Sequence, residues 1–259
     1  LIEKWIAEFG FEEAAKLAKA NNETPSLDYR LTAKSINNFE NQSLFELAKK
    51  GEIYFQDKGS QLVAETIDLQ PNEKFLDVCC APASKLSMIA TQNQNQNFFG
   101  GDFNFKRLKI AQNSCKKQGL KNVQLVQYDA EKTLPFQENC FDKILVDAPC
   151  SGTGTIRHNP EIRYFLQPND FADLSFKQLK ILANASKLLK RGGSLIYSTC
   201  SFETEENENV IERFLGENKD FEIVSPKLSQ EFLTEKKFAR TFPKRDKMDG
   251  FFIGVLKKV

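Results

Sequence analysis

The chain has 259 residues, of which 41% are hydrophobic and 27% are charged, a composition that is typical of a globular protein and excludes a disordered one. Its formal net charge of +1 gives no overall field that would attract nucleic acid, so any basic surface must be local. No apolar run approaches the roughly 18 residues that a membrane span requires, and no signal peptide is visible.

The first part of the chain predicts only a small attachment. Residues 1–20 carry apolar side chains at helical spacing, which indicates an amphipathic helix. Because this pattern is already running at Leu1, we expect an upstream segment to be missing. Residues 21–55 predict a short strand in "TPSLDYRLT" and a short helix in "SLFELAKKG", which ends at Gly51. Residues 1–55 are too few to form an independent core.

From residue 56 onward, predicted strands and helices alternate. The strands are expected in "KFLDVCC", "NFFGGD", "NVQLVQYD", "FDKILVDAP" and "GSLIYSTC", followed by "FEIV" and "FFIGVLKK". The helices are expected in "SQLVAETIDL", "SKLSMIATQ", "KRLKIAQNSCKKQG", and around residues 170–190 and 204–217. This order predicts an α/β domain over residues 56–259, with a mostly parallel seven-stranded sheet covered on both faces. Ligands of such sheets bind beyond the carboxyl ends of the strands.

The ends of the first three predicted strands carry acidic residues. The turn that follows Asp77 lacks the G-x-G-x-x-G pattern that brings a backbone close to a pyrophosphate, which argues against NAD or FAD. Asp102 ends the second strand 25 residues after Asp77, close to the spacing at which a carboxylate binds ribose hydroxyls. Asp129 ends the third strand, where it can accept from an adenine amino group. The set fits S-adenosylmethionine (AdoMet) better than a dinucleotide, although single acids at strand ends can also be turn or N-cap residues.

Two cysteines follow the fourth and fifth predicted strands. "ILVDAPCSGTG" places Asp147 and Cys150 before a long loop, and long loops inside compact domains are often functional. "YSTCS" places Cys200 at the end of the next strand. Because these strands are often neighbours in a parallel sheet, we expect both thiols to face one cleft beside the cofactor. The alternative is that they are inert packing residues, as buried cysteines usually are.

The cysteines do not suggest a metal site or a disulfide scaffold. None of the six forms a C-x-x-C pair, and His158 is the only histidine, so we expect no metal. The length of the chain also argues against dependence on disulfides. We therefore expect a reduced, cytoplasmic protein with thiols available for chemistry.

The motifs "DAPCSGTG", "RHNPEIRY" and "YSTCSFETEENENVI" resemble those of the RNA (cytosine-5) methyltransferases of the Sun/Nop type. The bacterial RsmB-like branch, which modifies 16S ribosomal RNA, is the most similar. The resemblance extends over nearly the whole chain and includes "ANNETPSLDYRLT", "QDKGSQ" and "DGFF". It implies a Rossmann-like class I AdoMet-dependent methyltransferase domain over residues 56–259. It also implies a reduced RNA-contacting subdomain within residues 1–55, and a monomeric protein that acts on RNA and not at a membrane.

The resemblance also implies a role for individual residues. Cys200 would be the nucleophile that adds to carbon 6 of the target cytosine, and Cys150 would assist breakdown of the adduct and release of product. Asp147 would meet the polar edge of the target base close to the cofactor, and Lys85 would lie near that base. The residues that would hold AdoMet are Cys79, Cys80, Ala81, Pro82, Ala83, Ser84, Lys85, Asp102, Asp129 and Asp147.

One segment departs from the family pattern. Family members usually carry C-A-A-P-G-G-K-T after the first strand, whereas this chain has Ala83 and Ser84 in place of the two glycines. We expect the replacement to restrict the backbone and to weaken AdoMet binding. Two alternatives therefore stay open: a catalytically inactive RNA-binding or assembly factor with the same fold, and a DNA cytosine-5 methyltransferase in which Cys150 attacks. The "ENV" triplet at 208–210 resembles a DNA methyltransferase motif, but it falls in a predicted surface helix.

Two segments are candidates for contact with RNA. Basic residues cluster in 236–247 with Phe238 and Phe242 between them, which indicates a surface that follows phosphates, although a solvated charged loop fits the composition equally well. Three residues of the long loop after Cys150 are expected to touch RNA near the target base: Arg157, His158 and Arg163.

Overall fold

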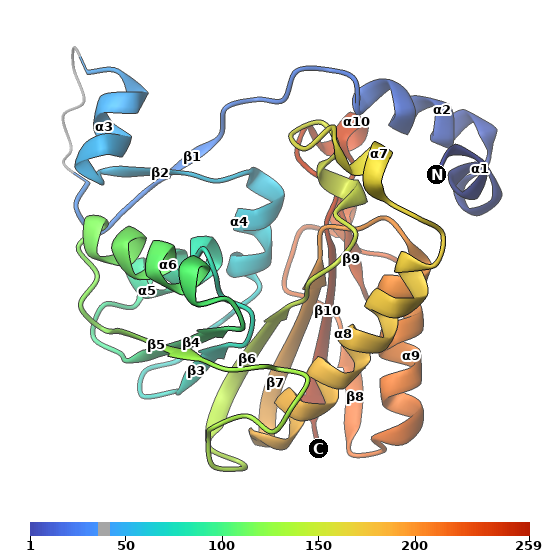
Figure 1. The fold of residues 1–259 in the computed structure, drawn as a ribbon. Coiled ribbons are helices and arrows are strands. Elements are labelled where there is room, and N and C mark those ends of the chain that lie inside the picture. Colours follow the sequence, from blue (N-terminus) through green and yellow to red (C-terminus); the bar gives the residue numbers. More distant parts are fainter. Residues whose placement is uncertain (36–41) are drawn as a thin grey trace.

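The computed structural model describes residues 1–35 and 42–259, and its main feature is one large sheet with helices on both faces (Figure 1). The strand order is β5-β4-β3-β6-β7-β10-β8, and a short β9 pairs with β10 as an eighth strand. β5, β4, β3, β6 and β7 run parallel to one another, whereas β10 is antiparallel to both of its main neighbours. The mostly parallel sheet with seven main strands is therefore confirmed.

The strands lie where the apolar runs predict them. Their bounds are β3 Phe75–Asp77, β4 Phe98–Asp102, β5 Val123–Gln127, β6 Phe141–Asp147, β7 Leu189–Thr199, β8 Phe221–Val224, β9 Ala239–Arg240 and β10 Phe252–Lys258. In β6, Ile144 and Val146 belong to one hydrophobic core and Leu145 to the other, and all three are fully buried. A strand that is covered on both faces needs such a continuous apolar run.

Five helices cover the two faces of the sheet. α4 (Lys58–Glu65), α5 (Ser84–Gln92) and α6 (Phe105–Lys117) pack on one face, and α8 (Asp170–Lys187) and α9 (Glu208–Glu217) pack on the other (Figure 1). α6 begins at Asn104, whose side chain accepts hydrogen bonds from the backbone N–H groups of Lys106 and Arg107. Such N-caps fix where a helix starts, and here the cap follows the strand end at once. No helix within the described residues is both long and apolar enough to cross a bilayer.

The first 55 residues form two separate pieces. Residues 1–20 make α1 (Ile2–Phe9) and α2 (Phe11–Ala20) instead of the single predicted helix, because Gly10 between them has a φ of 80°. α3 (Leu44–Lys50) begins at a capping box of Ser43 and Glu46 and ends at a left-handed Gly51, as predicted. The predicted strand β1 (Tyr29–Leu31) pairs with β2 (Ile53–Phe55), which was not predicted.

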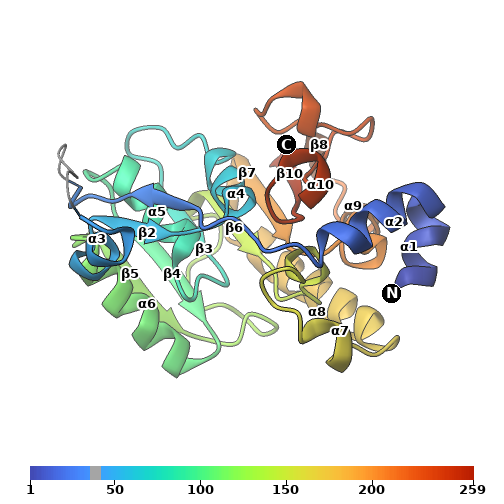
Figure 2. The same ribbon diagram turned by 90° about the horizontal axis from the view of Figure 1, so that it is seen from above.

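These two pieces lie at opposite ends of the large domain. Figure 2 shows α1 and α2 beside the helix α10 (Pro243–Asp246), whereas β1, β2 and α3 lie near α6. Trp5 of α1 is 2% exposed and packs edge-to-face on Phe202, with ring centroids 5.8 Å apart. The remaining short helical segments are η1 Thr153–Thr155, α7 Ile162–Phe165, η2 Thr204–Glu206 and η3 Gln230–Phe232.

Candidate active site

Two cysteine side chains meet where β6 and β7 end. The two strands are parallel neighbours, with Asp147 opposite Ser198, so the loops that follow them start side by side. The Sγ atoms of Cys150 and Cys200 are 3.3 Å apart, and both thiols are free and partly exposed. The backbone N–H of Gly154 donates to the carbonyl of Cys200 at 2.9 Å, which joins the two loops. The expected convergence of the two sulfur atoms is present in the structure.

A buried ion pair lies beside the cysteines. Lys85 Nζ is 2.7 Å from Asp147 Oδ2, and Asp147 Oδ1 accepts from the Ser198 hydroxyl at 2.8 Å. Burial of Lys85 disfavours its charged form, but the Asp147 carboxylate outweighs this effect, and the negative charge of a Cys200 thiolate acts in the same direction. The pKa of Lys85 is therefore raised, and its ammonium group stays charged next to Cys200.

A pocket of about 500 Å³ opens at the carboxyl ends of the strands and includes both cysteines. Asp102, Asp129 and Asp147 line it from the ends of three parallel strands. Asp102 Oδ1 accepts from the backbone N–H of Asn104 at 2.8 Å, and its other oxygen lies 3.3 Å from Arg107. The volume is in the range of small-molecule sites, and the acids supply acceptors for hydroxyl and amino groups. The pocket therefore fits a nucleoside-type ligand.

The loop after β3 contributes only part of the predicted contacts to this pocket. Cys79 and Ala81 line it, whereas the side chains of Cys80 and Ala83 are buried in the core beneath it. Pro82 is exposed outside the lining, and the Ser84 carbonyl accepts from Arg30 at 3.2 Å. The side chains of Cys80 and Ala83 therefore do not line this pocket, whereas binding of a ligand by Pro82, Ser84 and Lys85 stays a prediction.

Ala83 takes the backbone conformation that glycine favours. Its φ is 74° and its ψ is 30°, so the helix α5 begins at a left-handed residue. Replacement of a glycine has therefore not prevented the turn, although an L-residue adopts this conformation at a cost.

Glu206, a buried carboxylate next to the cysteine loops, was not predicted from the sequence. It accepts hydrogen bonds from the backbone N–H and the hydroxyl of Ser151, from the Ser201 hydroxyl at 2.6 Å, and from Gln178 Nε2 at 2.9 Å. In the sequence it is one of several acids in "ETEENEN", which reads as a solvated helix start. The only related feature of the sequence is that a serine follows each cysteine, and this feature does not indicate which carboxylate accepts from the serines.

The loop residues expected to contact RNA are instead paired with protein groups. The Arg157 side chain is 8% exposed, and its guanidinium lies 2.6 Å from Asp249 and 3.2 Å from Asp57. These ion pairs argue against the expected contact between Arg157 and RNA, because its charge is already used inside the protein. His158 Nδ1 lies 2.9 Å from Asp249, and Arg163 donates to Asn22 at 2.8 Å. Asp57, His158 and Asp249 come close enough to resemble a metal site, but Arg157 compensates both carboxylates.

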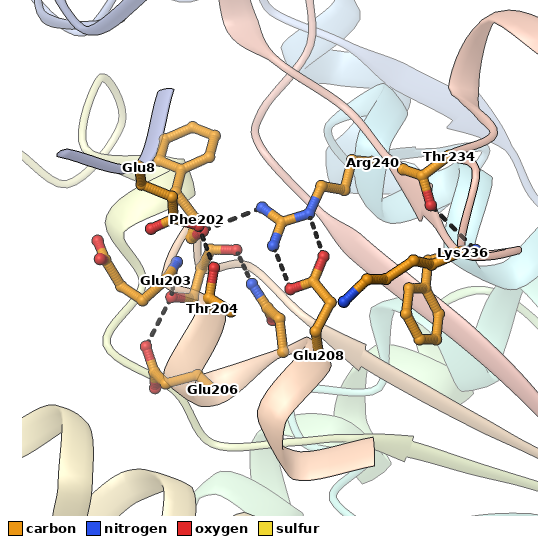
Figure 3. Close-up of polar contacts among 12 residues, drawn as sticks. Glu8, Phe202, Glu203, Thr204, Glu206, Glu208, Thr234, Lys236 and Arg240 are labelled. Carbon is orange, nitrogen blue, oxygen red and sulfur yellow. Dashed lines mark hydrogen bonds and ion pairs between the residues drawn. The ribbon is translucent and has the colours of Figure 1, made fainter. Parts of the chain in front are cut away.

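Of the basic residues in the segment 236–247, Arg240 is buried inside the protein, whereas Lys236, Lys237, Lys244, Arg245 and Lys247 are exposed. Arg240 is buried and pairs with Glu208, and it donates to the Phe202 carbonyl at 3.0 Å (Figure 3). Lys236 pairs with Glu212 at 2.9 Å, and Phe238 is 1% exposed. Arg240 and Phe238 are therefore not available to a surface that follows phosphates, and for the exposed lysines such a surface stays a prediction. Glu208, the first residue of the "ENV" triplet, is the structural partner of Arg240.

Comparisons with known proteins place this arrangement among methyltransferases. Residues 64–257 match the family model for "16S rRNA methyltransferase RsmB/F". The probable ribosomal RNA small subunit methyltransferase B of Bacillus subtilis is 33% identical, over 100% of this chain and 65% of that protein. The chain spans about half to two thirds of the length of the curated relatives it matches.

Two solved structures from Pyrococcus horikoshii have the same fold. A methyltransferase homolog protein superimposes with a TM-score of 0.77 at 26% identity, over 99% of this chain and 94% of that one. NSun6, solved with SFG, superimposes with a TM-score of 0.86 at 22% identity, over 100% of this chain and 97% of that one. The likeness thus includes the N-terminal pieces as well as the sheet.

Proposed function

The chain belongs to the 16S rRNA methyltransferase RsmB/F family, and on this premise we propose that it methylates carbon 5 of a cytosine in RNA. The methyl donor is AdoMet, the nucleophile is Cys200, and the RNA is 16S ribosomal RNA. The observation that carries the proposal is the 3.3 Å approach of two cysteine sulfur atoms inside a strand-end pocket. Inert core cysteines would not share a pocket with three acids and have a charged lysine beside them.

The strand-end pocket suits AdoMet. Its volume of about 500 Å³ accommodates a nucleoside with an amino-acid tail. We expect Asp102 to accept from the ribose hydroxyls, and Asp129, two residues after the end of β5, to accept from the adenine amino group. When bound, AdoMet supplies the methyl group. NSun6 was solved with SFG, which supports a ligand of this kind in the fold.

Cys200 activates the target base. Carbon 5 of cytosine is a poor nucleophile until a group adds to carbon 6, and a thiolate is the most effective protein group for such an addition. A bond forms between Cys200 Sγ and carbon 6, and the ring electrons move towards N3. The Lys85 ammonium group stabilises the thiolate before the addition and the ring charge after it. Asp147 meets the amino group of the base.

Cys150 supports release of the product. After carbon 5 has gained the methyl group, it loses its proton to solvent water, the electron pair of that bond restores the double bond between carbons 5 and 6, and Cys200 leaves as a thiolate. The hydrogen bond with Cys200 and burial raise the pKa of Cys150 well above its ordinary value, so it remains a protonated thiol beside the leaving sulfur. A protonated neighbour stabilises the departing thiolate.

Adduct trapping tests the proposal. RNA that carries 5-azacytidine or 5-fluorocytidine should cross-link to the wild type and not to Cys200→Ala. Cys150→Ala should instead accumulate the adduct with ordinary RNA. An adduct that survives Cys200→Ala contradicts the assignment of the nucleophile. Cross-linking of Cys150 to duplex DNA in preference to RNA would favour the DNA methyltransferase alternative, and absence of AdoMet binding by calorimetry would favour the inactive factor.

A further inference from the structure

Glu206 is the common acceptor for both cysteine loops. Its side chain is fully buried at the end of η2, a turn that is drawn in Figure 3 together with its neighbour Glu203. Ser151, which follows Cys150, donates to it through both its backbone N–H and its hydroxyl. Ser201, which follows Cys200, donates through its hydroxyl at 2.6 Å. One carboxylate therefore fixes the position of each cysteine through the next residue in the chain.

The third element held by this carboxylate is α8. Gln178 Nε2 donates to Glu206 Oε1 at 2.9 Å and to the carbonyl of Pro149 at 2.9 Å. Pro149 and Ser151 flank Cys150, so its backbone is held on both sides. The Ser151 and Ser201 hydroxyls are also within 3.1 Å of each other. The spacing of the two sulfur atoms thus depends on a network with Glu206 at its centre.

The charge of Glu206 lies on the Cys150 side of the pair. All four groups that donate to it are neutral, so they do not cancel a negative charge. On the other side of the pair, the cation of Lys85 acts on Cys200. A carboxylate thus lies near Cys150, and a lysine lies near Cys200.

The pKa of Cys150 agrees with this geometry. It is raised first by the hydrogen bond to Cys200, then by burial, and then by the negative charges of Cys200 and Glu206. A negative neighbour disfavours the thiolate form of Cys150. Addition to the base requires that the nucleophile has lost its proton, and release of Cys200 as a thiolate is assisted when the second cysteine still has one.

We propose that Glu206 is a positioning residue that holds the two cysteine loops in register and keeps the proton on Cys150 while Cys200 carries the negative charge. This proposal rests on the proposed function for its catalytic meaning. If Glu206 had only a structural role, its replacement would change folding and nothing else. The test must therefore measure the reactivity of the two thiols directly.

The test compares Glu206→Gln with Glu203→Gln in the full chain. Glu203 lies three residues earlier, is also fully buried, and accepts from Trp5 Nε1 at 3.0 Å. Alkylation by iodoacetamide, followed by mass spectrometry over a range of pH, measures the thiolate content of each cysteine. In Glu206→Gln, Cys150 should react at least about threefold faster near neutral pH. Glu203→Gln should react like the wild type.

Methyl transfer gives the second readout. Glu206→Gln should lower kcat by roughly 10- to 100-fold, with the KM for RNA changed by less than about threefold, because alignment of the thiols is lost while RNA binding is kept. Ser201→Ala keeps the carboxylate and removes its hydrogen bond to the Cys200 loop, together with the contact between the Ser201 and Ser151 hydroxyls. It should lower kcat by at least about threefold and leave the alkylation of Cys150 unchanged.

Each outcome decides the proposal. Unchanged alkylation of Cys150 in a folded Glu206→Gln, or equal changes in Glu203→Gln, would overturn it. If circular dichroism shows that Glu206→Gln does not fold, the decision passes to Ser201→Ala, and an unchanged kcat in that variant would overturn the proposal. Alkylation requires no RNA, so the two proposals can fail separately. If the wild type does not trap RNA but Glu206→Gln still alkylates faster at Cys150, the proposed function is wrong and the effect of Glu206 on Cys150 stands.

Discussion

The sulfur atoms of Cys150 and Cys200 lie 3.3 Å apart, although the two residues are separated by 50 positions in the chain. The contact arises because β6 and β7 are parallel neighbours that end at the same edge of the sheet. Free thiols at this distance need to approach by little more than 1 Å to reach the roughly 2.05 Å of a disulfide bond.

A mild two-electron oxidant should therefore link these two cysteines. With hydrogen peroxide, the two thiols lose two electrons and two protons to give a disulfide and water, and cross-linking to RNA should be lost and then restored by dithiothreitol. Peptide mapping without reduction should show the Cys150–Cys200 bond. In Cys150→Ser, Cys200 should proceed to sulfinic acid. Sulfinic acid on Cys200 in the wild type, without a disulfide, would contradict the prediction.

Gly154→Ala should disturb the cysteine loops. A Cβ at this position would lie 2.1 Å from the Gly250 carbonyl oxygen and 2.9 Å from that of Cys200, and both are backbone atoms that cannot swing aside. We expect the free energy of unfolding to fall by about 1–3 kcal/mol, and methyl transfer to fall with it. Urea denaturation and a methylation assay measure the two effects.

Gly216→Ala is the matched control, because its Cβ meets nothing within 4 Å and the residue lies within α9. It should raise the free energy of unfolding by about 0.5–1 kcal/mol and leave methylation unchanged. Equal effects of the two substitutions would refute the steric argument.

Arg157→Met should lower the free energy of unfolding, but it should not change the affinity of the folded protein for RNA. It leaves the buried carboxylates of Asp57 and Asp249 without their cation, and loss of one partner from a buried ion network costs about 3–5 kcal/mol. Urea denaturation should show this loss, while the exposed Arg191→Met should change stability by less than about 0.5 kcal/mol. A stable Arg157→Met with a raised KM for RNA would restore the contact that the sequence suggested.

The sequence predicts the sheet and the strand-end chemistry because both depend on local patterns. Continuous apolar runs mark strands that are buried on both faces, and chain order places Cys150 and Cys200 after adjacent strands. The single helix predicted over residues 1–20 fails at Gly10, because the positive φ depends on how α1 and α2 pack. Local patterning cannot detect such a break.

Charged residues were the least predictable part of the site. Arg157 and Arg240 look like exposed cations in the sequence, yet each has acidic partners that are far away along the chain. Glu206 looks like one acid among many, yet it accepts from two loops and a helix. Pairing of this kind is set by tertiary contacts, so composition cannot separate a binding surface from an internal ion pair.

Glu203 should make stability depend on pH. Burial raises the pKa of its carboxyl from 4.5 to about 7, and the Trp5 hydrogen bond opposes this only in part. Between these two values the folded state binds more protons than the unfolded state, so stability falls as the pH rises through the window. Glu203→Gln should remove the slope and be more stable than the wild type by at most about 3 kcal/mol near pH 8.

Chemical denaturation near pH 5 and near pH 8 measures this difference. Glu205→Gln is the control, because Glu205 is 41% exposed and should leave the slope unchanged. Parallel pH profiles for the wild type and Glu203→Gln would show that another group titrates.

Ala83→Gly should leave AdoMet affinity nearly unchanged, contrary to what the missing glycine suggests. Ala83 already has a φ of 74°, and its methyl group is fully buried in the core rather than in the pocket lining. Glycine relieves about 1–2 kcal/mol of left-handed strain. It also loses about 0.8 kcal/mol from the buried methyl group and gains freedom in the unfolded chain worth about 0.4–1 kcal/mol. These contributions offset one another to within about 1 kcal/mol.

Calorimetry with AdoMet should give a Kd for Ala83→Gly within about threefold of the wild type. Ala83→Val is the contrast, because it adds two methyl groups to a filled core at a positive φ, which should lower the free energy of unfolding by more than about 2 kcal/mol. A tenfold or greater tightening in Ala83→Gly would mean that this residue limits cofactor binding. That result would give weight to the inactive-factor alternative, since the wild-type loop would then be the weak point of the site.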